Sequence, residues 1–151
     1  MKSVKIFLNT KNTRYATIEV HETLAGMRKA IMAFRPDSKN IRRVVGQCCP
    51  HERINTRTGR THREIANVFL CSNNCGAGVA GHELLHAVLW AFQYKKYKNQ
   101  YPIVINNMDE EEELLHNHSH AVMQFYQWYF KNYQEIKGRY VENPKESPPG
   151  L

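Results

Sequence analysis

Two histidines, His82 and His86, lie four residues apart in a stretch with helical periodicity, and this pair constrains the chain more than any other feature. Residues four apart on a helix share one face, so both imidazoles can reach the same point. Glu83 follows the first histidine directly. Because apolar residues surround the pair and small residues precede it, we expect one long helix from about Ala77 to Tyr97.

Two neutral imidazoles with a carboxylate beside them match the needs of a catalytic zinc site. His82 and His86 can each bind Zn2+ through a ring nitrogen at about 2.0–2.1 Å. Glu83 can take a proton from zinc-bound water and pass it to a leaving group. The alternative is a buried helix whose two histidines are merely hydrogen-bonded. A strand and a glycine-containing turn directly before the helix favour the zinc site, with Glu83 as catalytic base.

A catalytic zinc also needs a third protein ligand and a position open to water. The residue six positions after His86 is Phe92, which excludes a third histidine at that spacing. The acidic block Glu110–Glu113 opens the next predicted helix and offers carboxylates instead. The run also suits the positive N-terminal end of a helix, so at least two of the four glutamates are expected only to cap that end and solvate it.

Helix geometry selects among these acids. We expect an inward stripe on the last helix that consists of Leu115, Ser119, Val122 and either Phe125 or Tyr126. Counting back three residues from Leu115 gives Glu112, and counting back four gives Glu111. Glu112 is therefore our first choice for the third ligand. Glu111 and then Glu113 follow it, and His116 is a rival ligand.

The remaining pattern predicts an α+β fold in one domain, residues 1–140, followed by a disordered tail, 141–151. Thr23 can cap the first helix, and Pro36 marks its end. The expected elements, in order, are a hairpin of Val4–Leu8 and Tyr15–Val20, a helix over 24–34, a strand at Ile41–Cys48, an exposed and mobile loop over Pro50–Thr61, a strand at Glu64–Cys71, the helix described above, a short strand or connector at Tyr101–Asn107, and a helix that ends near Lys137.

The net charge of +7 comes from 21 basic and 14 acidic residues, and the first half of the chain is markedly basic. A basic surface attracts nucleic acid or acidic proteins. No basic motif interleaved with aromatic residues is present, so we interpret the excess as a solvated surface rather than a nucleic-acid site.

The cysteines and the lack of a long apolar segment bear on the cellular compartment of the protein. Cys48, Cys49, Cys71 and Cys75 lack the paired CxxC spacing of a four-thiolate zinc site, so we expect free thiols. No segment approaches the roughly 20 apolar residues of a membrane span, and the apolar N-terminal run is too short for a signal peptide. We therefore predict a cytoplasmic protein without membrane contact.

The segment Gly78–Trp90 resembles the active-site helix of zincin metallopeptidases of the gluzincin type. It is similar to short zincin-like proteins of bacteriophage and prophage genomes, which combine a preceding strand, a GHExxHA core and a later helix that opens with two glutamates. The matching parts here are Ile65–Leu70, the helix around His82, and Glu112 with Glu113. The resemblance implies a backing helix, a small twisted mixed sheet, the active helix and a C-terminal glutamate helix.

The same resemblance implies a function and a mode of substrate binding. It implies hydrolysis of peptide bonds in a peptide or protein substrate, by a phage protein in a bacterial host. The strand before the active helix, Ile65–Leu70, would be the sheet edge that pairs with an extended substrate. The alternative from another class is a non-catalytic zinc-binding module that binds a protein or nucleic acid through its basic half.

Overall fold

The computed structural model describes residues 1–97, 105 and 107–133, and these form an α+β fold, as expected. The elements in chain order are β1 (Lys2–Phe7), β2 (Tyr15–His21), α1 (Leu24–Phe34), the 3-10 turn η1 (Ile41–Arg43), β3 (Gly46–Pro50), β4 (Glu64–Cys71), the 3-10 turn η2 (Ser72–Asn74), α2 (Ala77–Tyr97) and α3 (Met108–Tyr133). No described helix is long and apolar enough to cross a membrane. The predicted tail, the domain end at residue 140 and most of the 101–107 connector lie outside the described residues.

The four strands form one mixed sheet in the order β1-β2-β4-β3. β1 pairs antiparallel with β2, β2 pairs parallel with β4, and β3 pairs antiparallel with β4. The prediction that Ile65–Leu70 forms the sheet edge is wrong, because β4 is hydrogen-bonded on both sides. Every residue from Ile65 to Cys71 is buried, as expected of a central strand covered on both faces. The outer strand beside α2 is β3.

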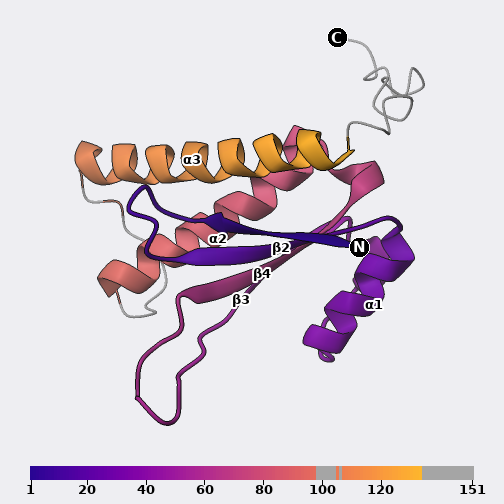
Figure 1. Ribbon diagram of the computed structural model, residues 1–151, viewed down its shortest axis with the longest axis horizontal. Coiled ribbons are helices and arrows are strands. Elements are labelled where there is room, and N and C mark those ends of the chain that lie inside the picture. The colour runs from indigo at the N-terminus through magenta and orange to yellow at the C-terminus, as the bar shows by residue number, and fades with distance from the viewer. Residues whose placement is uncertain (98–104, 106, 134–151) are drawn as a thin grey trace.

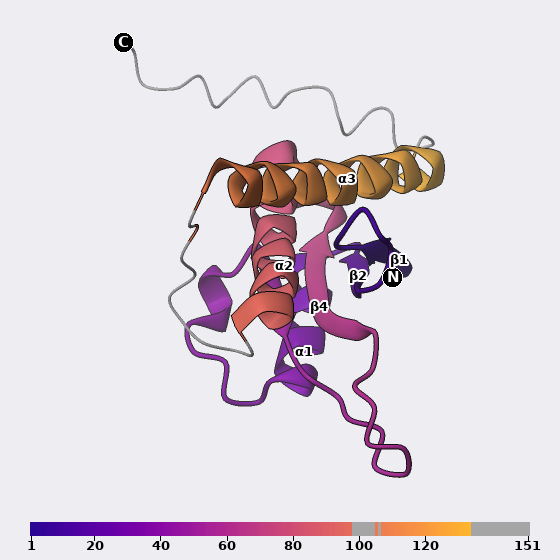
Figure 2. The same cartoon turned by 90° about the vertical axis from the view of Figure 1, so that its left-hand side faces the viewer.

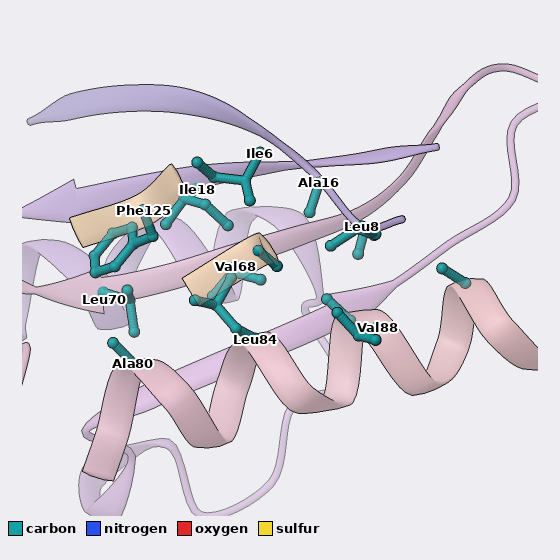
Figure 3. Close-up of a cluster of buried hydrophobic side chains, with 14 of the residues drawn as sticks. Ile6, Leu8, Ala16, Ile18, Val68, Leu70, Ala80, Leu84, Val88 and Phe125 are labelled. Carbon is teal, nitrogen blue, oxygen red and sulfur yellow. The ribbon is translucent and has the colours of Figure 1, made fainter. Parts of the chain in front are cut away.

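The sheet lies between α1 on one face and α2 with α3 on the other (Figure 1). On the α2 side, Ile18, Val68 and Leu70 of the sheet pack toward Ala80 and Leu84 of α2 (Figure 3). On the opposite face, a smaller cluster joins apolar residues of α1 to β3 and β4; its buried members are Met27, Ile31, Cys49, Phe69 and Cys71. Helix α2, which carries His82 and His86, is thus anchored to the larger core.

The first helix begins as the sequence indicates, but the next strand starts late. The Thr23 hydroxyl accepts a hydrogen bond from the Gly26 N–H at 3.1 Å and so caps α1. The strand predicted at Ile41–Cys48 is wrong in its first half. Asn40 has a left-handed backbone (φ 57°) that opens the turn η1, and pairing with β4 begins only at Gly46.

Helix α3 crosses α2 and covers the β1–β2 hairpin (Figure 2), and its buried face differs from the predicted one. The buried residues are Leu114, Asn117, Ala121, Phe125, Tyr129 and Tyr133, whereas Leu115 is 57% exposed. Polar contacts with the hairpin fix this rotation. The Asn117 side-chain oxygen accepts from the Thr10 N–H at 3.0 Å, and the Gln124 amide exchanges hydrogen bonds with the Phe7 backbone.

Candidate metal centre

Helix α2 presents its two histidines on the side turned away from the sheet. Ala80, Leu84 and Ala87 are fully buried against the core, while His82 and His86 are exposed. The Nε2 atoms of the two imidazoles lie 3.1 Å apart, which is a hydrogen-bonding distance in the metal-free protein, and the rings are nearly perpendicular. The structure therefore brings together the pair that the sequence singled out.

The spacing of these two nitrogens suits a shared metal ion. Two ligands bound to one tetrahedral zinc at about 2.0–2.1 Å are about 3.3 Å apart. The observed 3.1 Å between the Nε2 atoms of His82 and His86 is close to that value. Both rings reach this point from one helix, so little rearrangement is needed for both to bind a single ion.

Glu83 is held between α2 and the outer strand of the sheet. It is half-buried, and its Oε2 accepts a hydrogen bond from the Cys48 backbone N–H at 2.7 Å. This is a charge-assisted bond, which is shorter and stronger than a neutral one. The carboxylate next to the histidine pair therefore has a fixed orientation.

Gly46 permits this close approach of strand to helix. A Cβ atom on Gly46 would lie 2.8 Å from Val79 Cγ1 and 3.2 Å from both Glu83 Cγ and Leu70 Cδ2. The sequence reasoning missed Gly46 and Cys48 as parts of the site. The available signal was a glycine inside a predicted strand, which often marks a close backbone approach.

A groove of about 290 Å3 opens between β3 and α2. Glu83 and His86 form part of its wall, so the carboxylate and one imidazole face a space that a ligand can enter. The lining residues are Lys39, Val44, Gly46, Gln47, Cys48, Pro50, Glu83, His86 and Trp90.

The third metal ligand is not assembled among the described residues. No group of three or more His, Cys, Asp or Glu side chains there is placed to hold a metal ion. Glu111 and Glu112 are exposed, while Glu113 is half-buried and lines a different cavity beside the β1–β2 turn. The choice of Glu112 rested on an inward Leu115, which is wrong. Glu112 as a ligand therefore stays a prediction without that support.

His118, on α3, is hydrogen-bonded to the backbone of α2. Its Nε2 lies 3.0 Å from the carbonyl oxygen of Gly81, directly before His82. His116, the predicted rival ligand, is exposed, and His120 contacts Asn12 in the β1–β2 turn. The sequence allowed His118 a role at the site but favoured His116, because the place of His118 on the α2-facing side of α3 depends on the rotation of that helix.

All four cysteines are free thiols, as expected. Burial raises the pKa of the Cys48 thiol, and the nearby negative charge of Glu83 raises it further. Burial also raises the pKa of Cys75 to about 12, and Cys71 contributes to this shift. Both thiols are therefore neutral at pH 7 in the metal-free protein.

Comparison of the chain with protein-family models, with curated proteins and with solved structures finds no match. A functional assignment therefore depends on the chemistry of the residues themselves. Two convergent imidazole nitrogens, an oriented carboxylate and an adjoining groove are the parts on which such an assignment can build.

Proposed function

We propose that this protein is a zinc-dependent metallopeptidase with a zincin-like active helix. In this proposal His82 and His86 hold the zinc ion, and Glu83 is the catalytic base. The observation that carries it is the 3.1 Å separation of the two Nε2 atoms on the exposed side of α2, one residue from a carboxylate that lines a groove. We retain the acidic start of α3 as the source of the third ligand, with Glu112 as the first residue to test.

The proposed chemistry divides between the metal and Glu83. A bound zinc ion would polarise the scissile carbonyl and lower the pKa of the attacking water. The Glu83 carboxylate would take a proton from that water and deliver it to the leaving amide nitrogen. In the protein without substrate, its hydrogen bond to the Cys48 N–H holds this carboxylate at the groove.

The substrate would add to β3, in place of the strand predicted from the sequence. Among the described residues, β4 is the single strand that pairs with β3, so the outer edge of β3, which borders the groove, would pair with an extended peptide. Such a peptide would compete with Glu83 for the Cys48 N–H. Substrate binding would then release the carboxylate for proton transfer at the moment when it is needed.

Two measurements test the proposal. Elemental analysis of the purified protein should give one zinc per chain, and His82→Ala with His86→Ala should lose it. Glu83→Gln should keep the zinc and lose cleavage of a protein substrate by at least about a hundredfold, the lower range for loss of a general base. Glu22→Gln, on an exposed glutamate outside the groove, is the matched control and should retain activity.

The same pair of measurements separates the rival functions. If the wild type binds zinc but cleaves no protein in a denatured proteome, the peptidase proposal is contradicted and the zinc-binding module remains. Failure to bind zinc at all would contradict both. Alanine substitution of Glu111, Glu112 and Glu113 in turn identifies the third ligand by the loss of zinc affinity.

A further inference from the structure

The loop between β3 and β4, His51–Arg63, is mostly exposed, as expected, and projects as a hairpin-like arm. Ile54 and Thr61 form an antiparallel bridge, and hydrogen bonds flank it from the His62 N–H to the Arg53 carbonyl and from the Asn55 N–H to the Arg60 carbonyl, at 2.8 and 2.9 Å. Figures 1 and 2 show that this arm extends away from the sheet and lies clear of the helices. It is therefore an accessible feature with defined backbone geometry.

The tip of the arm is closed by its own hydrogen bonds. The Asn55 side-chain oxygen accepts from the N–H groups of Arg57 and Thr58, both at 3.0 Å. Gly59 adopts a left-handed backbone (φ 67°), and its N–H donates to the Asn55 carbonyl at 2.8 Å. Since the turn is already formed, a ligand that binds the tip would not have to pay for ordering it.

The four arginines of the arm divide into two pairs with different surroundings. At the base, Arg53 forms an ion pair with Glu64 at 3.5 Å, and Arg63 donates to the Asn12 and Thr13 carbonyls of the β1–β2 turn. At the tip, the exposed side chains of Arg57 and Arg60 have no hydrogen bond or ion pair with the described residues. Structural contacts account for Arg53 and Arg63 at the base of the arm. They leave Arg57 and Arg60 at its tip unexplained.

The composition of the arm identifies the chemistry of its partner. Besides the four arginines it has three threonines, one acid (Glu52) and no Phe, Tyr or Trp. Its one large exposed apolar side chain is Ile54. Protein interfaces depend on buried aromatic or aliphatic anchors, whereas arginine and hydroxyl groups are the usual contacts to phosphate. The arm therefore suits a polyanion better than a folded protein.

We propose that this arm binds the phosphate backbone of duplex DNA, with Arg57 and Arg60 each contacting a phosphate. The major groove of B-form DNA, about 12 Å wide, admits a two-stranded ribbon, while the deep, narrow major groove of A-form RNA does not. This interaction is independent of the zinc site, because none of the contacts that form the arm involves His82, Glu83 or His86.

The test measures binding of the full chain to a short fluorescein-labelled DNA duplex by fluorescence anisotropy, between about 50 and 200 mM salt. The logarithm of the association constant falls linearly with the logarithm of the salt concentration. In the double variant Arg57→Ala/Arg60→Ala this negative slope should become shallower by about 1.8, which is about 0.9 for each phosphate that is no longer neutralised. The control is Arg42→Ala/Arg43→Ala, which removes the same charge from two exposed arginines of η1. This control should keep the wild-type slope.

Three results would overturn the proposal. One is an unchanged slope in the tip variant. Another is an equal loss in the η1 control, which would mean that only the overall charge matters. The third is tighter binding of wild type to an RNA duplex or to polyglutamate than to the DNA. Thermal unfolding of the tip variant should match the wild type, since the two exposed side chains form no hydrogen bond or ion pair with the described residues, and zinc content should be unaffected in both variants.

Discussion

Replacement of Gly46 by alanine tests whether β3 is pressed against α2 as closely as the site requires. The added Cβ would lie 2.8 Å from Val79 Cγ1, against an optimal carbon–carbon separation of about 3.5–4.0 Å. Strand and helix must therefore move apart by about 1 Å. Overpacking of this kind costs about 1–3 kcal/mol. At roughly 4 °C for each kcal/mol in a domain of this size, Tm should fall by about 4–12 °C.

The assay is thermal and urea unfolding, followed by circular dichroism, of a matched set of variants. Val79→Ala alone should cost about 1 kcal/mol, because less methyl surface is buried. In combination with Gly46→Ala it should relieve the clash, so the double variant should be at least about 1 kcal/mol more stable than the sum of the two single effects. Gly78→Ala is the control, because a Cβ there meets nothing within 4 Å. A stable Gly46→Ala variant, or strictly additive effects, would refute the close packing.

Three further predictions follow from local contacts. Burial lowers the pKa of His51, so on acidification the unfolded state binds a proton at this histidine before the folded state does. Stability should therefore be unaffected well above pH 6.5 and should fall below pH 6.5. His51→Gln should flatten this fall in urea-unfolding measurements made across that pH range. Thr23→Ala should cost about 1 kcal/mol in chemical unfolding because the Gly26 N–H loses its cap, and an effect under about 0.3 kcal/mol would count against the cap. Asn117→Ala should lower stability by about 1–3 kcal/mol by removing the acceptor of the Thr10 N–H, and no measurable loss would show that this hydrogen bond is unimportant.

Local signals predicted most elements, because they depend on short-range chemistry. The hairpin, the Thr23 cap and the helix around His82 each follow from spacing or from one capping side chain. The histidine pair belongs to this class, since its geometry is set by a single helix. Sequence alone could therefore identify this half of the candidate site.

The errors arose where a distant partner decides the outcome. Apolar residues on α3 form two stripes one position apart, and only the contacts of Asn117 and Gln124 with the hairpin select the stripe that contains Leu114 over the one that contains Leu115. The edge position given to β4 ignored a readable signal. An almost continuous apolar run, interrupted in β4 by Asn67 alone, is typical of a strand covered on both faces, and hence of a central one.

The central position of β4 also determines when, during synthesis, other elements can cover this strand. Its parallel partner, β2, lies about fifty residues earlier in the chain (Tyr15 pairs with Glu64), and the helix that covers it comes later. During synthesis, β4 therefore emerges before α2 and α3 can shield it, as a β-forming segment prone to self-association. The charged residues Arg63, directly before β4, and Glu64, at its start, are placed as gatekeepers against aggregation. Changes that slow the docking of α2, Gly46→Ala among them, should reduce soluble yield in cells by more than their loss of stability suggests.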